Sequence, residues 1–183
     1  DANERIKYDT RNRNLLKIRN ALLLKFLYLT AARRSEAANL KWEDLQQDGE
    51  FQVVILQQTK SGEPQKLKLR KELFEELECW NETLKTNQIE CEWVFPSLSF
   101  RTLGGKMSGK GVNDVVSKLG SAIGLKISAH YLRHTAITLA LELGEPLQKV
   151  QSYARHASAN TTIRYFHDQQ FLEKNPTDRL PMI

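Results

Sequence analysis

Three segments of the chain concentrate side chains that can bind anions or exchange protons. They are residues 30–36 (TAARRSE), residues 128–134 (SAHYLRH) and residues 154–165 (ARHASANTTIRY). A further candidate is Lys60, which precedes the turn signals Gly62 and Pro64. Arginine stays ionised and donates paired hydrogen bonds to phosphate, and imidazole exchanges protons near neutral pH. These residue types predict a site that holds a negatively charged group and moves protons around it.

The order of these residues resembles that in the catalytic domain of the tyrosine recombinases, the phage integrase family. That family has an arginine in a segment like TGLRISE, a lysine in a β-hairpin, an H-x-x-R helix, and a histidine and a nucleophilic tyrosine with two threonines between them. The matching residues here are Arg33, Lys60, His130, Arg133, His156 and Tyr165, with Thr161 and Thr162 as the threonine pair. His156 and Tyr165 keep the family's interval of nine residues. The resemblance extends over residues 15–167 and identifies these six side chains as the predicted catalytic set.

The resemblance implies cleavage of DNA without a metal, another cofactor or ATP. Two arginines, Arg33 and Arg133, would hold the non-bridging oxygens of a phosphodiester, where negative charge grows in the transition state. The hydroxyl of Tyr165 would attack phosphorus and form a 3′-phosphotyrosine, which conserves the ester bond for a second strand to attack. Neighbouring Arg34 is a second possible match for the first arginine, and the motif position favours Arg33.

The remaining three residues are predicted to transfer protons or to donate a hydrogen bond. His130 would act as acid or base, His156 would donate a hydrogen bond to the phosphate, and Lys60 would protonate the departing 5′ oxygen. His130 and His134 stand four residues apart, a spacing that zinc sites use, but no third ligand has a suggestive spacing. We therefore expect no metal here, and we expect His134 to be a buried structural residue. Glu36 is expected to stabilise the arginine segment through local hydrogen bonds.

The chain departs from the family pattern at three places near these residues. Ala31 stands where the family usually has glycine, Arg34 where it has an apolar residue, and Ala154-Arg155 where it has Leu-Gly. None of these changes removes one of the six functional groups. We expect them to affect the local backbone conformation and the rate of the reaction.

The predicted partner is double-stranded DNA at a recombination site. The resemblance adds a homo-tetramer that exchanges strands through a Holliday junction, with accessory DNA-bending proteins as possible further partners. It also implies a cytoplasmic location in a bacterium or phage-infected host, in association with the nucleoid. Two alternatives remain at this point: a type IB topoisomerase, which shares the tyrosine chemistry, and a catalytically idle DNA-binding module.

The hydrophobic pattern predicts the elements that must position these residues: a mainly α-helical domain with a small antiparallel sheet. Helical periodicity indicates helices near residues 15–30, 35–45, 73–84, 112–123, 130–143, 147–153 and 161–167. Residues 51–58 and 66–69 are expected to form a β-hairpin. We interpret residues 1–14 as a linker remnant, 15–167 as the catalytic domain and 168–183 as a C-terminal tail, with an N-terminal DNA-clamping domain missing.

Composition limits the other classes of protein. The chain has 183 residues and a net charge of +5, which favours an anionic partner without specifying one. No apolar run approaches the roughly 18–20 residues that span a bilayer, and no secretory signal is present in this sequence. The two cysteines, Cys79 and Cys91, form no metal-binding pair; we expect reduced thiols, with a single disulfide as the alternative.

Overall fold

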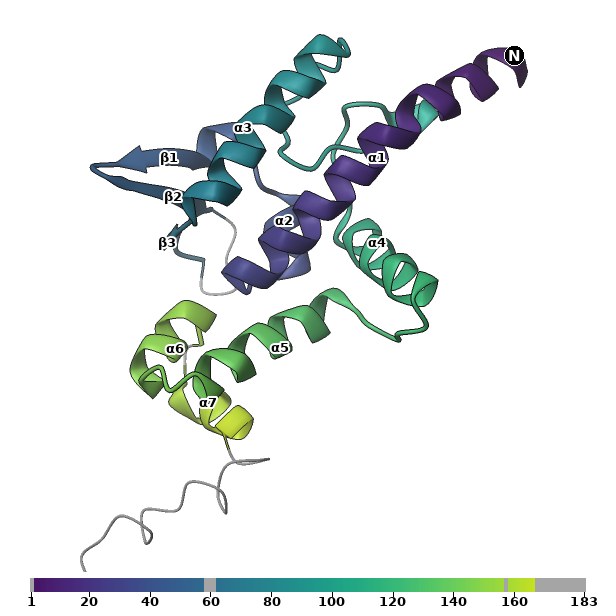
Figure 1. The fold of residues 1–183 in the computed structure, drawn as a ribbon. Helices are drawn as coiled ribbons and strands as arrows, with labels where there is room; N and C mark the ends of the chain where they lie inside the picture. The colour runs from purple at the N-terminus through teal and green to yellow at the C-terminus, as the bar shows by residue number, and fades with distance from the viewer. Residues whose placement is uncertain (1, 58–61, 157, 167–183) are drawn as a thin grey trace, which may run out of the picture. The chain divides into compact units, whose positions relative to one another are not determined.

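The computed structural model describes residues 2–57, 62–156 and 158–166, and it forms two compact units, Asp1–Arg133 and His134–Ile183 (Figure 1). The first unit holds α1 (Ala2–Thr30), α2 (Arg34–Ala38), α3 (Lys71–Thr86), α4 (Gly109–Ala122) and two single-turn 3₁₀ helices, η1 (Trp42–Asp44) and η2 (Phe100–Thr102). Helix α5 (Ala129–Glu142) begins in the first unit and continues into the second, which also holds α6 (Leu147–Ala154) and α7 (Ala159–Phe166). The predicted fold class, mainly α with a small antiparallel sheet, is confirmed.

Helix α1 is longer than its apolar pattern predicts. The pattern places its start near Leu15, whereas the helix begins at Ala2, so that residues 2–14, predicted as a linker remnant, form its first half. These residues are polar but contain few helix breakers, and extending an existing helix costs far less than nucleating one. The apolar stripe therefore does not mark where α1 begins. The division of the chain into linker, domain and tail stays a prediction.

The sheet has three antiparallel strands in the order β1-β2-β3: β1 (Leu45–Asp48), β2 (Phe51–Leu56) and β3 (Gln65–Lys68). The predicted β2–β3 hairpin is confirmed, with Val54 paired with Leu67. The helix predicted for residues 35–45 is wrong in its second half, since α2 ends at Ala38 and η1 and β1 follow. A tight turn at Gly49, whose φ of 60° suits glycine, pairs Asp48 with Phe51 and makes β1 possible.

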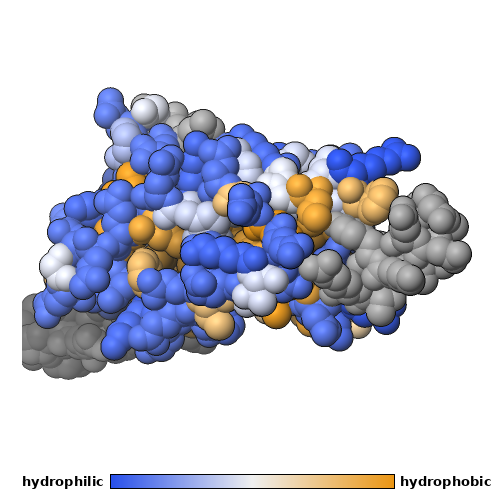
Figure 2. Space-filling view, turned by 90° about the horizontal axis from the view of Figure 1, so that it is seen from above, coloured by the Kyte–Doolittle hydropathy of each residue, from blue (hydrophilic) through white to orange (hydrophobic). Residues whose placement is uncertain are grey.

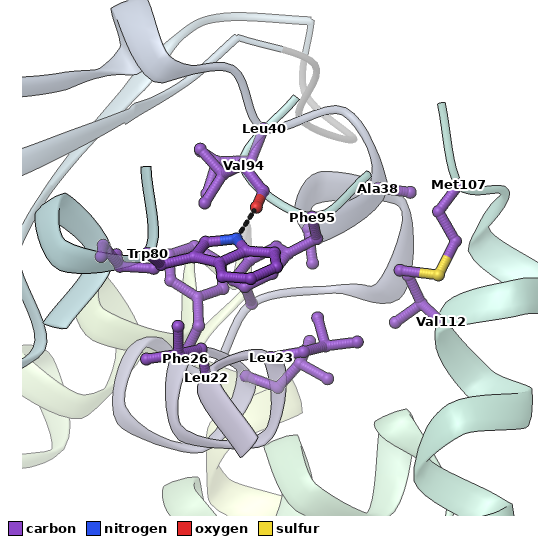
Figure 3. Close-up of a cluster of buried hydrophobic side chains, with 14 of the residues drawn as sticks. Leu22, Leu23, Phe26, Ala38, Leu40, Trp80, Val94, Phe95, Met107 and Val112 are labelled. Atoms are coloured by element: carbon purple, nitrogen blue, oxygen red, sulfur yellow. Dashed lines mark hydrogen bonds between the residues drawn. The ribbon is translucent and has the colours of Figure 1, made fainter. Parts of the chain in front are cut away.

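The core of the first unit gathers apolar side chains from the four helices α1–α4, the sheet and the segment after α3. Figure 3 shows the part of this core around Phe26 and Trp80. Trp80 of α3 is buried and its indole Nε1–H donates to the carbonyl oxygen of Val94 at 2.9 Å. The rings of Phe26 and Phe95 lie 5.5 Å apart in a tilted arrangement. Trp80, Val94 and Phe95 thus belong to a core that fixes the C-terminal end of α1, where the arginine segment begins.

A buried arginine joins α1 to the same segment. The guanidinium of Arg19 donates through Nη1 to the carbonyl oxygen of Pro96 at 3.0 Å and through Nε and Nη2 to Oδ1 of Asn20. Burial lowers the pKa of Arg19 to about 10. The side chain thus stays protonated near neutral pH and satisfies a carbonyl that would otherwise be buried without a partner.

Helix α4 has no room for a side chain at Gly120. A methyl group there would lie 2.4 Å from Cγ1 of Ile127 and 2.7 Å from the carbonyl oxygen of Leu125. We expect Gly120→Ala to lower the free energy of unfolding by about 2 kcal/mol, because overpacking typically costs about 1–3 kcal/mol. Urea unfolding measures this. Gly109→Ala is the control in the same helix, since its methyl group would meet no atom closer than 3.6 Å; equal losses in the two variants would contradict the prediction.

Hydrophilic residues predominate on the face drawn in Figure 2, and hydrophobic residues show between them. None of the helices in the described ranges is both long enough and apolar enough to cross a membrane. Cys79 is exposed and Cys91 is partly buried, and both are free thiols, as expected. Burial raises the pKa of the Cys91 thiol.

Candidate active site

Arg33 is held by a buried carboxylate. It stands in extended backbone immediately before α2. Oε1 of Glu36 accepts from Nη1 of Arg33 at 2.7 Å, and Oε2 accepts from the backbone N–H of Arg33, also at 2.7 Å. Glu36 is 3% exposed, whereas the Arg33 side chain keeps a quarter of its surface. The local role predicted for Glu36 is confirmed, and Arg33 is fixed at both its backbone and its side chain.

Arg133 contacts the same arginine segment from α5. It is 4% exposed, and its Nη1 donates to the carbonyl oxygen of Ala31, two residues before Arg33. Ala31 has a positive φ of 48°, a conformation that favours glycine. This explains why a glycine is usual at that position in the family that the sequence resembles. The first unit therefore brings the two predicted phosphate-binding arginines to one stretch of backbone.

His130 lies on α5 one turn before Arg133, so the two side chains share a face of the helix. The start of α5 is capped: the backbone N–H of Ala129 donates to Oδ1 of Asn113, and that of Tyr131 donates to Oγ of Ser128. His130 is exposed, as a group that meets a substrate must be. The capped helix start fixes the backbone on both sides of His130.

His134 differs from its prediction. It is exposed rather than buried, and its Nδ1 lies 3.4 Å from Oγ1 of Thr138. The four-residue spacing from His130 places both rings along α5, but the helix does not bury this face at position 134. Across the described parts of the chain, no three His, Cys, Asp or Glu residues form a group that could hold a metal ion.

His156 is the best-fixed predicted residue of the second unit. Its backbone N–H donates to the carbonyl oxygen of Gln151 at 3.1 Å, and Nε2 of Gln151 donates back to the carbonyl oxygen of His156 at 3.2 Å. Its ring Nδ1 lies 2.9 Å from Oγ1 of Thr162, a fully buried residue of α7. Backbone and ring are thus held from two helices that pack on each other.

Arg155 ends α6 in the left-handed conformation, with φ 54° and ψ 46°. The family that the sequence resembles usually has glycine here, and such a C-cap position favours glycine because a Cβ atom is strained in this region. The side chain of Arg155 donates through Nη1 to the carbonyl oxygen of Tyr153 at 3.1 Å. This chain therefore keeps the turn that places His156 at the cost of backbone strain.

We expect Arg155→Gly to be more stable than Arg155→Ala by about 1 kcal/mol. Both variants lose the arginine side chain, and only the glycine variant relieves the left-handed backbone. The free energy of unfolding from urea titration gives the difference. An alanine variant as stable as the glycine variant would show that this turn stores no strain.

The other two predicted residues are described less fully. Tyr165 lies on α7, three residues after Thr162, and the structure describes its backbone. Lys60 lies outside the described residues, between β2 and β3. The structure thus places Arg33, His130 and Arg133 in the first unit, where Arg133 contacts the arginine segment, and places His156 and Tyr165 in the second. That all six meet at one phosphate stays a prediction.

Apart from Glu36, sequence reasoning missed the residues that hold the predicted set in place. Gln151 gave no signal, because a glutamine inside a polar helix is common. Thr162 was part of a recognised motif without a role of its own. Asn113 caps a helix that lies far from it in sequence, which no local pattern reveals.

The chain is similar to known proteins in both sequence and fold. The sequence model described as "Phage integrase family" matches residues 3–171. The tyrosine recombinase XerA of Pyrococcus horikoshii is 33% identical over 148 residues, which is 81% of this chain and 50% of that protein. A tyrosine recombinase of Synechococcus elongatus is 31% identical over 165 residues, 88% of this chain and 51% of that protein. The chain spans about half the length of these curated relatives.

A solved structure shows the same fold. The crystal structure of the XerH site-specific recombinase, bound to a palindromic difH substrate in a post-cleavage complex, matches with a TM-score of 0.72 at 26% identity. The match covers 86% of this chain and 45% of that one. The mainly helical fold with its small sheet is therefore shared with part of this recombinase structure.

Proposed function

This chain belongs to the phage integrase family, and we propose that it cuts and rejoins DNA strands through a covalent 3′-phosphotyrosine at Tyr165. The observation that carries the proposal is the pair of arginines held on one segment. Arg33 is bound by buried Glu36, and Arg133 donates to the carbonyl oxygen of Ala31. Two fixed guanidinium groups near one stretch of backbone suit a phosphodiester, whose non-bridging oxygens gain charge during the reaction.

In the proposed reaction the Tyr165 hydroxyl oxygen forms a bond to phosphorus and the bond from phosphorus to the 5′ oxygen breaks. The hydroxyl proton passes to His130, and the ammonium of Lys60 protonates the departing oxygen. An unperturbed tyrosine has a pKa of about 10, so forming its anion at neutral pH costs about 4 kcal/mol. The base and the nearby positive charges supply that energy, and the reverse steps join a new 5′ end.

His156 has a different task in this proposal. Its ring Nδ1 contacts Oγ1 of Thr162 at 2.9 Å, and Nε2 is the ring atom that we propose as the donor to a non-bridging oxygen. The backbone contacts with Gln151 fix where this donor lies. A preorganised donor of this kind stabilises the transition state without having to reorient during the reaction.

The proposed partner is double-stranded DNA; the similar XerH structure is bound to its palindromic difH substrate. We extend the proposal to a homo-tetramer that assembles on paired recombination sites, with possible accessory DNA-bending proteins. The proposed location is the cytoplasm, where the DNA of a bacterium or phage-infected host lies. The net charge of +5 agrees with a polyanionic partner.

A nicked suicide substrate tests the proposed activity. Cleavage next to the nick releases a short fragment, so the covalent complex cannot be rejoined and accumulates. We expect a protein–DNA adduct that survives denaturation, with mass spectrometry locating the nucleotide on Tyr165. An adduct on another residue, or none on substrates carrying the cognate site, would contradict the proposal.

A further inference from the structure

A buried hydroxyl contacts the ring of His156. Thr162 has no exposed surface, and its Oγ1 lies 2.9 Å from Nδ1 of His156. Within the described parts of the chain, this is the one hydrogen bond made by the Thr162 side chain. A hydroxyl can donate or accept, so the distance alone leaves the position of the ring proton open.

Burial of Thr162 decides which atom donates. A buried O–H group that lacks an acceptor costs about 1–3 kcal/mol. Nδ1 of His156 is the acceptor within reach, and it accepts only when the ring proton is on Nε2. If Nδ1 carried the proton instead, Nδ1–H would donate to Oγ1 of Thr162. The hydroxyl hydrogen of Thr162 would then need another acceptor. The geometry therefore favours the Nε2–H tautomer of the neutral ring.

We propose that Thr162 is a positioning residue for His156: its hydroxyl donates to Nδ1, keeps the ring proton on Nε2 and so presents an N–H donor to the phosphate. The value of this arrangement to cleavage rests on the proposed function; the tautomer itself does not. The backbone of His156 is fixed independently by Gln151. Thr162 thus controls the tautomer and rotation of a ring whose position is already set.

The tautomer can be measured without DNA. Long-range ¹H–¹⁵N spectra of the chain labelled at histidine, recorded at about pH 8 where an unperturbed imidazole is neutral, distinguish Nε2–H from Nδ1–H. His156→Gln identifies the His156 signals by their loss. We expect Nε2–H in the wild type, a mixture of tautomers in Thr162→Val, and a return to Nε2–H in Thr162→Ser. Nδ1–H in the wild type, or an unchanged spectrum in Thr162→Val, would overturn the proposal.

A rate measurement connects the tautomer to the reaction. The single-turnover rate of covalent capture should fall about 10- to 100-fold in Thr162→Val, the range expected when a reacting group is misplaced, and should recover in Thr162→Ser. Thr161→Val is the matched control, because Thr161 is exposed and no role is assigned to its hydroxyl. A valine variant that cleaves like the wild type would overturn the link to catalysis. If the wild type captures no DNA, the proposed function fails while the spectra still decide the tautomer.

Discussion

Tyr165→Phe is expected to form no covalent adduct with DNA while binding the same DNA as the wild type does. Phenylalanine keeps the ring and removes only the oxygen that would bond to phosphorus, so no slower version of the same step remains. Phosphate contacts made by arginine and lysine supply most of the affinity for DNA, and this substitution leaves them in place. Capture on the nicked substrate, after denaturing electrophoresis, measures the first effect, and a mobility shift at fixed salt measures the second.

Tyr131→Phe is the matched control for this experiment. Tyr131 is an exposed tyrosine on α5 with no role in the proposed reaction, so its variant should capture DNA like the wild type. An adduct in Tyr165→Phe equal to that of the wild type would remove Tyr165 as the nucleophile. If neither the wild type nor Tyr165→Phe formed an adduct, the idle DNA-binding module would be favoured instead.

The fold was predictable wherever an element carries a periodic apolar face. The helices α3, α4, α5, α6 and α7 lie within a few residues of their predicted positions, because each places apolar residues at helical spacing. The N-terminal half of α1 has no such face, and for this reason the sequence pattern predicts a linker there. Strand β1 (LQQD) was missed for the same reason: it is short, polar and exposed except at Leu45.

The candidate site stays a prediction from residue types in order, and of the contacts that hold its residues only the one closest in sequence was predictable. Arg33 and Glu36 interact over three residues, so sequence alone indicated their contact. The bond from Arg133 to the carbonyl oxygen of Ala31 spans 102 positions, and no local pattern encodes it. Two departures from the family pattern have a backbone explanation. Ala31 and Arg155 both adopt positive φ at positions where the family usually has glycine.

Arg133→Ala is expected to slow covalent capture by about 10²- to 10³-fold, the usual loss when one preorganised donor to a developing charge is removed. A second loss accompanies the first, because the carbonyl oxygen of Ala31 loses its buried donor and the free energy of unfolding falls by about 1–3 kcal/mol. Unfolding must therefore be measured beside the rate, and the rate taken at a temperature where the variant is folded.

Arg133→Lys separates the two contributions. Lysine keeps the positive charge and can still donate, but it lacks the planar fork that binds phosphate through two parallel bonds. We expect it to recover more of the lost stability than of the lost rate. Arg34→Ala is the comparison variant: Arg34 is exposed, and the motif position favours Arg33, so we expect its loss to slow capture less than the loss of Arg133 does. Cleavage by Arg133→Ala at the wild-type rate would exclude Arg133 from the site. The same conclusion would follow if, across the three variants, the rate of covalent capture fell only in proportion to the free energy of unfolding.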